Sequence, residues 1–309
     1  MKFSPLFWSI ELKNGVIYIL DETLLPKKVK YIRAHNYQQA AKAIKDMKTR
    51  AVGQVLLVMY TFLLSLEQKK DLAKVADTLN RTRPTLPFKV LTDMVLGWAS
   101  QGAPVDGCIF GFLESLKNAR IKQAEEAAGL LKDGDVILTY CNVSGLMPLI
   151  GKIARSQNKK VGFFASETRP YLQGSRLTAW ELQQAGLDVT VITDNMAAYV
   201  MSLGKVNMVI VGADNLALNG DIANKVGTYQ LAILAKYFKI PFYVLCPPPS
   251  RAKSGDDIKI EIRPDKELFE FQGVRLAPRG VKGYYPAFDV TPNELITKHI
   301  YLEVGNARE

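Results

Sequence analysis

The sequence has few cysteines and histidines, the side chains that form zinc sites and, in the case of cysteine, disulfides. Its 309 residues include three cysteines and two histidines. Cys108, Cys141 and Cys246 are far apart, without the closely spaced pairs typical of zinc sites and disulfide frameworks. His35 and His299 lie far from the motifs described below. Because histidine is the residue most often used in acid–base catalysis, we expect any chemistry to depend on cysteine, aspartate or lysine.

Membrane-spanning and leader segments are also not found. The most apolar run, residues 52–66, is interrupted by Gly53, Gln54 and Thr61 and is too short and too mixed to span a bilayer. No N-terminal stretch resembles a signal peptide, so we expect a cytoplasmic protein without a membrane partner. The sequence contains neither a G-x-G-x-x-G nor a Walker-type loop, which argues against a dinucleotide or a nucleotide triphosphate as ligand.

Positive charge is abundant. The net charge is +10, and residues 1–50 contribute +6, from ten Lys or Arg minus four Asp or Glu. Such a surface could attract phosphorylated small molecules or nucleic acid. A solvated face in a lysine-rich chain explains the charge more simply, and the usual RNA- and DNA-binding motifs do not occur. We therefore do not expect nucleic acid as a partner.

The first third of the chain predicts a β-hairpin followed by helices. Residues 8–21 contain two alternating apolar runs around Asn14-Gly15, a strong hairpin signal. Helical spacing begins at Tyr37, and further helices are predicted at about 51–66, 68–79, 87–100 and 113–132. With 48% hydrophobic residues, the chain is long enough for two domains. We expect a smaller, mainly helical N-terminal domain over residues 1–112.

Short apolar strands alternate with helices in the rest of the chain. Strands are predicted at about 135–140, 160–164, 188–192, 207–211 and 241–245. Helices are predicted at about 144–156, 175–185, 195–203 and 222–238. This alternation is typical of an α/β fold with a parallel sheet covered by helices on both faces, so residues 113–309 are expected to form a Rossmann-like catalytic domain. Ligands of such sheets bind beyond the carboxyl ends of the strands.

Two reactive side chains follow predicted strands. Cys141 comes directly after strand 135–140 and shortly before a helix, whose N–H groups would favour the thiolate. A lone cysteine is nevertheless more often buried and inert. Asp214 follows strand 207–211, where a carboxyl group in a closed pocket could serve as a general acid. It could equally cap its own loop, and position alone leaves both alternatives open.

The segment after Asp214 predicts a helix from about Ile222, with Asp221 as its cap. The evidence is a set of apolar residues at helical spacing, namely Val226, Tyr229, Ile233 and Tyr237. Asn224 and Lys225 would then lie in the first turn, where free N–H groups favour an anion. This arrangement suits a small phosphorylated substrate, although a capped helix after a turn explains the same spacing.

These motifs resemble those of one known family. Gly212-Ala213-Asp214 and residues 219–236 (NGDIANKVGTYQLAILAK) are similar to the methylthioribose-1-phosphate isomerases. That family is related to the ribose-1,5-bisphosphate isomerases and to regulatory subunits of a translation-initiation nucleotide exchange factor. The similarity is specific over about residues 161–245 and at residues 286–296 (PAFDVTPNELI), and looser before residue 161.

The resemblance implies roles for residues of the second domain. Cys141, in the segment TYCN, matches the family's catalytic cysteine, and Asp214 matches its catalytic aspartate. Gln173, within SETRPYLQGSRLTAW (residues 166–180), matches a glutamine that touches the substrate. Asn224 and Lys225 match residues that contact substrate hydroxyls. The chain departs from the family where Tyr140 replaces a histidine and Ser166 replaces a more common aspartate.

Phosphate binding is implied by residues of the first domain. Arg83-Pro84-Thr85 resembles the family's Arg-Pro-Thr-Ala, whose arginine can bind phosphate oxygens bidentately. The family's second phosphate loop, Arg-Gly-Ala-Pro-Ala-Ile-Gly, corresponds to the segment that begins Arg50-Ala51. Arg50 and Ala51 are therefore expected to bind substrate, but the Gly and Pro that shape the family's loop are absent. Arg50 could instead be a surface charge.

The resemblance implies an aldose–ketose isomerase that converts 5-methylthioribose 1-phosphate to 5-methylthioribulose 1-phosphate, as in methionine salvage. It implies a homodimer and neither a metal nor an organic cofactor. One alternative is the same reaction on 5-deoxyribose 1-phosphate or ribose 1,5-bisphosphate. Another is a non-catalytic subunit that senses sugar phosphate or nucleotide in translation initiation. The presence of both Cys141 and Asp214 favours catalysis.

Overall fold

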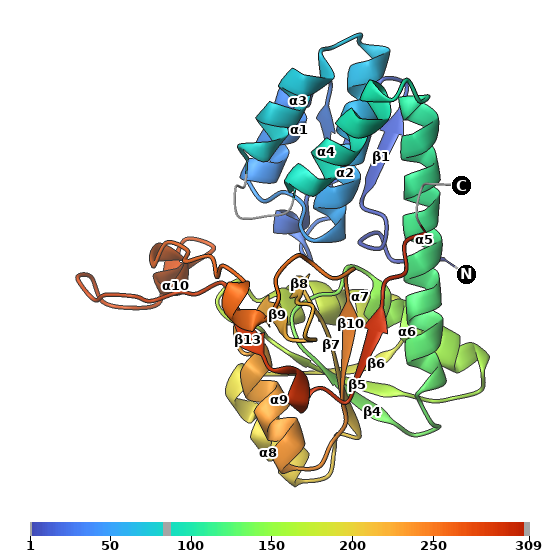
Figure 1. Cartoon of the computed structure of the whole chain (residues 1–309). Helices are drawn as coiled ribbons and strands as arrows, with labels where there is room; N and C mark the ends of the chain where they lie inside the picture. The colour runs from blue at the N-terminus through green and yellow to red at the C-terminus, as the bar shows by residue number, and fades with distance from the viewer. Residues whose placement is uncertain (1, 83–87, 306–309) are drawn as a thin grey trace. The chain divides into compact units, whose positions relative to one another are not determined.

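The computed structural model describes residues 2–82 and 88–305 (Figure 1). It divides into two compact units, residues 1–121 with 303–309 and residues 122–302. Helix α5 (Val105–Gly129) begins in the first unit and ends in the second. The domain boundary predicted at residues 112/113 falls inside this helix. Among the described residues, no helix combines the length and apolarity needed to cross a bilayer.

The first unit opens with the predicted hairpin. Strands β1 (Ile10–Lys13) and β2 (Val16–Leu20) pair antiparallel, and both turn residues, Asn14 and Gly15, have positive φ as this turn requires. A third strand, β3 (Tyr31–Ala34), completes an antiparallel sheet of order β1-β2-β3. The hairpin prediction is confirmed, and the third strand was not predicted.

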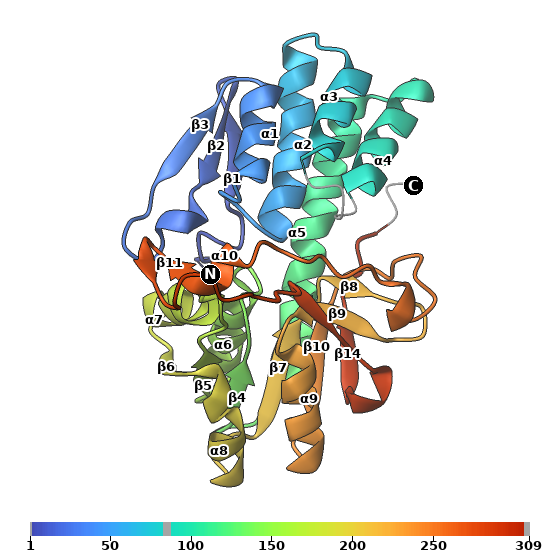
Figure 2. The same cartoon turned by 90° about the vertical axis from the view of Figure 1, so that its left-hand side faces the viewer.

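Helices cover this sheet, as Figure 2 shows for α1 and α2. Helices α1 (Tyr37–Lys45) and α2 (Val52–Glu67) contact the sheet, and α3 (Leu72–Asn80) and α4 (Phe88–Ser100) pack against them. Helix α2 is buried along most of its length, which fits its apolar sequence. The helices predicted over residues 51–100 are confirmed to within a few residues, whereas the helix predicted from residue 113 starts eight residues earlier. Gly107 and Gly111 weaken the local helical signal there.

The second unit is built on a parallel six-stranded sheet of order β14-β10-β7-β4-β5-β6. Its strands are β4 (Val136–Thr139), β5 (Gly162–Ser166), β6 (Asp188–Ile192), β7 (Met208–Gly212), β10 (Phe242–Cys246) and β14 (Lys298–Tyr301). All five neighbouring pairs are parallel. The predicted strands are confirmed to within two residues at their starts and ends, and the α/β fold class is confirmed with them.

Helices pack on both faces of this sheet. They are α6 (Leu146–Ser156), α7 (Ala179–Gln184), α8 (Ala197–Ser202) and α9 (Thr228–Tyr237). Phe164 of β5 contacts the core cluster formed with α8 and α9, while its neighbour Phe163 lies against Gly151 of α6. Since successive side chains of a strand point to opposite faces, α6 and the α8–α9 pair cover opposite sides.

An edge of the sheet is tied to α5. The Gln123 side-chain amide, which is buried, donates to the carbonyl oxygen of Cys246 at 3.0 Å and to that of Ile300 at 2.8 Å. These carbonyls belong to β10 and β14, so one amide bridges the two strands. A single polar side chain in an apolar core is stable here because both of its N–H groups are satisfied.

The helix predicted from Ile222 is wrong at its start. Residues Ile222–Lys225 form strand β9, which pairs antiparallel with β8 (Asn215–Leu216) and β13 (Phe288–Thr291). Asn224 and Lys225 are therefore not in a helical first turn. Asp221 does not cap a helix there; its carboxylate accepts from the backbone N–H groups of Gly255 and Asn293, each at 2.9 Å.

Helix α9 also turns a different face to the core than its spacing suggested. Three of the four apolar residues that indicated the helix are exposed, at 40% for Tyr229, 45% for Ile233 and 78% for Tyr237. The buried face consists of Leu231, Ala232 and Ala235. After β10, the chain forms the short helix α10 (Lys266–Phe269) and a hairpin of β11 (Glu270–Phe271) and β12 (Val274–Arg275).

Candidate functional site

The candidate catalytic residues follow neighbouring strands of the parallel sheet. Cys141 lies two residues beyond the end of β4, and Asp214 lies two residues beyond the end of β7. These two strands are paired and run in the same direction. Cys141 and Asp214 therefore lie at the same edge of the sheet, beyond the carboxyl ends of its strands. The loops also touch, because a Cβ added to Gly212 would lie 3.1 Å from Val143 Cγ1. Gly212 therefore permits the loop of Cys141 to approach the loop of Asp214.

The backbone of Cys141 is held in an unusual conformation. Its φ is +63°, in the left-handed region that costs an ordinary residue about 1–2 kcal/mol. Two buried hydroxyls fix it: the Cys141 N–H donates to Thr168 Oγ1 at 2.9 Å, and Thr178 Oγ1 donates to the Cys141 carbonyl at 2.6 Å. Strain maintained by surrounding bonds is common at functional positions.

The residues after Cys141 are anchored to α7. The Asn142 amide donates to Thr178 Oγ1 at 3.1 Å and to the buried carboxylate of Glu181 at 2.7 Å. Its carbonyl oxygen accepts from the Ser144 N–H at 3.0 Å. The loop from Cys141 to Ser144 is thus fixed at several points, so the thiol is presented from a rigid support.

Gln173 directly precedes a π-helical segment, Gly174–Thr178, which follows the loop after β5 and leads into α7. Its side chain is buried. The next residue, Gly174, lies so close to the chain that an added Cβ would overlap the carbonyl oxygen of Ser166. Asp194 closes the loop by accepting from Ser166 Oγ at 2.6 Å and from the Thr168 N–H at 2.8 Å. Ser166 therefore makes a defined contact here, although it replaces the more common aspartate.

Asn224 and Lys225 are buried side chains of β9. The Asn224 amide donates to Thr228 Oγ1 at 3.0 Å. The Lys225 ammonium donates to Tyr285 Oη at 3.0 Å and lies over the rings of Tyr285 and Phe288, at 5.2 and 5.6 Å from their centroids. A buried lysine needs such partners, because an isolated ammonium would be costly to desolvate.

Asp214 adjoins this strand but is not enclosed. Its N–H donates to the carbonyl of Ala223 at 2.9 Å, next to Asn224. The Asp214 side chain is exposed, in contrast to the closed pocket expected around a general acid. The surrounding residues of the sheet edge therefore do not by themselves exclude water from its carboxyl group.

Two residues beside the predicted site residues were given no role from the sequence. The Asp289 carboxylate accepts from the N–H groups of Gly227 at 2.6 Å and Tyr229 at 3.2 Å, and Asp289 is the register partner of Asn224. Burial raises the pKa of Asp289 to about 6, against the lowering effect of these hydrogen bonds. In the sequence, Asp289 lies in the segment PAFDVTPNELI (residues 286–296). That segment showed the family resemblance, but none of its residues was assigned a role.

Tyr140 is the second such residue, which the sequence marked only as a departure from the family. It replaces the family's histidine, is buried, and donates from its hydroxyl to the carbonyl of Val226 at 2.8 Å. Burial raises the pKa of Tyr140 above its ordinary value, so the hydroxyl keeps its proton. Its phenol ring fills the space beside Gly227, where an added Cβ would lie within 3 Å of Tyr140 atoms.

The predicted phosphate-binding residues belong to the first unit. Arg50 and Ala51 precede α2, and Ala51 has a φ of +45°. The Arg50 N–H donates to Glu22 Oε1 at 3.0 Å, and Arg50 Nε lies 3.9 Å from Glu22 Oε2. Arg50 is therefore held by an ion pair rather than being a simple surface charge. Arg83 lies outside the described residues.

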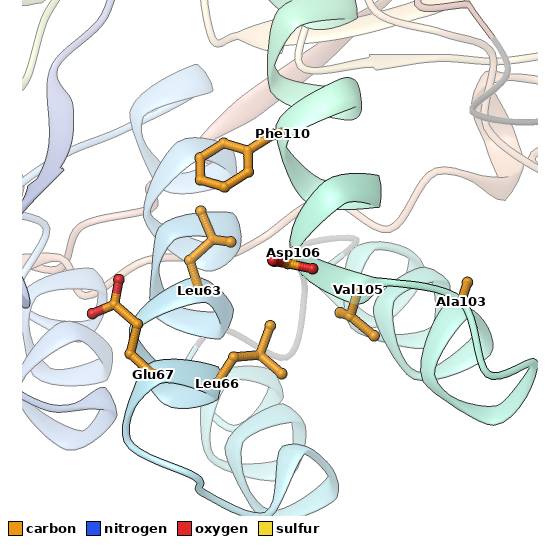
Figure 3. A pocket seen from close by; sticks show the side chains of 7 residues that line it. All are labelled: Leu63, Leu66, Glu67, Ala103, Val105, Asp106 and Phe110. Atoms are coloured by element: carbon orange, nitrogen blue, oxygen red, sulfur yellow. The ribbon is translucent and has the colours of Figure 1, made fainter.

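A separate cavity of about 530 Å³ lies in the first unit, between the end of α2 and the start of α5 (Figure 3). It is lined by Leu63, Leu66, Glu67, Ala103, Val105, Asp106 and Phe110. None of these is a predicted site residue. Its two carboxylates would repel a phosphate, so this cavity is not suited to a sugar phosphate.

Comparison with known proteins identifies the family. The model of the Initiation factor 2 subunit family matches residues 30–308. The methylthioribose-1-phosphate isomerase of Thermosipho africanus is 40% identical over 320 residues, covering 94% of this chain and 92% of that protein. The protein of the same name from Thermotoga maritima is 39% identical over 323 residues, with the same two coverages.

Solved structures agree with these matches. The 5-methylthioribose 1-phosphate isomerase from Pyrococcus horikoshii superposes with a TM-score of 0.86 at 31% identity, over 97% of this chain and 93% of that chain. The structure described as translation initiation factor eIF-2B, subunit delta, from A. fulgidus gives 0.81 at 36% identity, over 96% and 94%. The resemblance seen in the motifs is thus confirmed over nearly the whole length. This chain belongs to the Initiation factor 2 subunit family, and its close full-length relatives are methylthioribose-1-phosphate isomerases.

Proposed function

We propose that this chain is an aldose–ketose isomerase that converts 5-methylthioribose 1-phosphate to 5-methylthioribulose 1-phosphate. The observation that carries the proposal is the pair formed by Cys141 and Asp214, which follow neighbouring strand ends in a chain whose full-length relatives bear that enzyme's name. The strained, doubly anchored backbone of Cys141 supports a chemical role over that of an inert core cysteine.

The substrate sets a specific chemical problem. Its anomeric carbon carries the phosphate, so the ring cannot open to a free aldehyde while the phosphate stays in place. In the proposed mechanism, Asp214 gives a proton to the ring oxygen as the bond between C1 and that oxygen breaks. Cys141 takes the proton from C2, which yields an enol phosphate. Return of a proton to C1, with loss of the proton on the C2 oxygen, gives the ketose.

The remaining predicted residues bind and position the substrate in this proposal. Gln173, Asn224 and Lys225 contact the sugar, and Arg50, Ala51 and Arg83 bind the phosphate. Asp214 is exposed in the unliganded chain, so the bound sugar itself must displace water from its carboxyl group before proton transfer. We further propose that the enzyme acts in the cytoplasm as a homodimer, for which sedimentation should give twice the chain mass of 34.4 kDa.

A turnover screen tests the function. The purified chain is mixed with 5-methylthioribose 1-phosphate, 5-deoxyribose 1-phosphate and ribose 1,5-bisphosphate, and ketose formation is measured. We expect the highest kcat/KM for the methylthio sugar. Higher kcat/KM for another of the three would change the substrate and keep the reaction. Reaction in deuterated water separates proton transfer, which introduces deuterium at C1, from a direct hydride shift, which does not.

A second function is supported by one comparison. The A. fulgidus structure described as an initiation-factor subunit is 36% identical to this chain. A regulatory subunit would bind a sugar phosphate or nucleotide without converting it. Binding of the three sugar phosphates without turnover of any would favour this alternative over the isomerase.

A further inference from the structure

A buried carboxyl group lies beneath the predicted phosphate loop. Glu22 is 4% exposed and follows β2 at the start of a short 3-10 turn, Glu22–Leu24. Its N–H donates to the carbonyl of Lys48 at 2.8 Å, which fixes the turn against the segment that leads into α2. Burial raises the pKa of Glu22, and Arg50 acts in the opposite direction. Carboxyl groups are rarely buried so completely without a specific partner.

The partner is the segment Thr49-Arg50. Glu22 Oε1 accepts from Thr49 Oγ1 at 2.8 Å and from the Arg50 N–H at 3.0 Å, while Glu22 Oε2 lies 3.9 Å from Arg50 Nε. One carboxyl group therefore holds both the backbone and the side chain of Arg50.

The surrounding residues fit around this contact. Thr49 is fully buried, and its carbonyl accepts from Gln54 Nε2 at 3.0 Å. Gly53 packs directly against Thr49, because an added Cβ would overlap Thr49 Oγ1. Ala51, between these anchors, has a φ of +45°, a backbone conformation that favours glycine. The chain thus keeps an unfavourable backbone conformation by fixing the residues on either side.

We propose that Glu22 is the positioning residue that holds Arg50 and Ala51 ready to bind the substrate phosphate. The inference rests on the proposed function, since it assigns a support to a loop whose phosphate role is itself a proposal. A merely structural Glu22 would affect the stability of the first unit and leave substrate affinity unchanged.

The test compares Glu22→Ala and Glu22→Gln with the wild type. Glutamine keeps the shape and an oxygen acceptor, so it also serves if the alanine variant does not fold. The phosphate is bound before and during the reaction, so its loss from the loop should raise KM with little change in kcat. We expect KM for 5-methylthioribose 1-phosphate to rise about tenfold in Glu22→Ala and about threefold in Glu22→Gln, in the range of a lost charged hydrogen bond.

Ser65→Ala provides the matched control. Ser65 is equally buried in the first unit, on α2, and donates to the carbonyl of Thr61 at 2.7 Å without touching Arg50. Its substitution should lower the melting temperature and leave KM unchanged. A rise of KM in Ser65→Ala equal to that in the Glu22 variants would reduce Glu22 to a general stability role and overturn the inference.

Arg50→Met separates the inference from the function on which it rests. The inhibition constant of inorganic phosphate is measured with KM for each variant. If Arg50→Met leaves both unchanged, the phosphate role of Arg50 is wrong and the inference fails with it. If Arg50→Met raises both and neither Glu22 variant does, only the positioning role is wrong. If both residues act as one unit, Glu22→Ala combined with Arg50→Met should be no worse than Arg50→Met alone.

Discussion

At the scale of single residues, Cys141 and Asp214 could be located from sequence because each follows a short apolar strand, and parallel strands bring their ends to one edge. The surroundings of these two residues could not be predicted from sequence. The left-handed backbone of Cys141 depends on Thr168 and Thr178, which are distant in sequence. The exposure of Asp214 likewise depends on the packing of loops, on which local composition has no influence.

Cys141→Ser should abolish turnover while substrate binding is retained. A serine hydroxyl is a far weaker base than a thiolate, and loss of a positioned acid or base costs about 10²–10⁴ in rate. The measurement is kcat with 5-methylthioribose 1-phosphate, together with its dissociation constant. Cys108→Ser, on α5, is the control and should keep the wild-type rate. More than a tenth of the wild-type kcat in Cys141→Ser would contradict the catalytic role.

The raised pKa of Asp289 predicts that the free energy of unfolding depends on pH. The pKa of Asp289 is raised by burial to about 6 from 3.8, so the folded state holds the proton more tightly than the unfolded state. The resulting stabilisation is present in full below about pH 4 and is lost as the pH rises through about 6.

Urea denaturation of wild type and Asp289→Asn over this range measures the effect. The free energy of unfolding of the wild type, relative to that of Asp289→Asn, should fall as the pH rises, by at most about 1.4 kcal/mol per pH unit. Parallel pH curves for wild type and Asp289→Asn would show that Asp289 titrates as it does in the unfolded chain.

At the scale of helices and strands, short runs rich in Val and Ile sufficed to predict the parallel sheet. Residues 222–225 show where local pattern fails. Their partners in β13 lie more than sixty residues further along the chain, at Phe288–Thr291. The spacing of Tyr229, Ile233 and Tyr237 indicated a helix correctly but assigned its buried face wrongly, because those side chains are exposed. Apolar residues at helical spacing indicate that one face of a helix is apolar. They do not indicate whether other parts of the protein cover that face.

Gly174→Ala should destabilise the second unit. The added methyl group would overlap the backbone carbonyl of Ser166, which cannot move aside as a flexible side chain could. We expect the free energy of unfolding to fall by about 1–3 kcal/mol, as for other overpacked sites.

Gly97→Ala is the matched control on α4, where the added Cβ meets no atom within 4 Å. Replacing a helical glycine by alanine should raise the free energy of unfolding by about 0.5–1 kcal/mol. Both values come from urea denaturation. Equal effects of the two substitutions would show that the backbone around Gly174 adjusts to the methyl group without cost.

At the scale of the whole molecule, sequence predicted a helical part with a hairpin and an α/β part. It did not predict that residues 303–305 belong with the first unit. That association depends on contacts such as the hydrogen bond from the Gly305 N–H to Ser115 Oγ at 3.0 Å, between residues far apart in sequence. Neither charge nor hydrophobic pattern identifies such a contact.

The net charge of +10 predicts a salt-dependent reaction rate. A positive field attracts a phosphorylated substrate and is screened by salt. Between about 20 mM and about 300 mM salt, kcat/KM for 5-methylthioribose 1-phosphate should fall about threefold or more. The uncharged sugar 5-methylthioribose, measured as an inhibitor, is the control, because its inhibition constant should not depend on salt. A flat kcat/KM would show that the basic residues do not influence substrate capture.

The hydrogen bonds from Gln123 to Cys246 and Ile300 have a consequence for folding during synthesis. Strand β14 is the last strand of this sheet to be translated, so during synthesis β10 lies at the edge of a sheet that still lacks one strand. Its backbone groups, and one of the two N–H groups of the Gln123 amide, stay unpaired until residues 298–301 leave the ribosome. An uncovered margin of this kind recruits strands from other chains. Nascent chains that stall before residue 298 should therefore aggregate, whereas chains that contain residues 298–301 cover β10 with their own edge strand, β14.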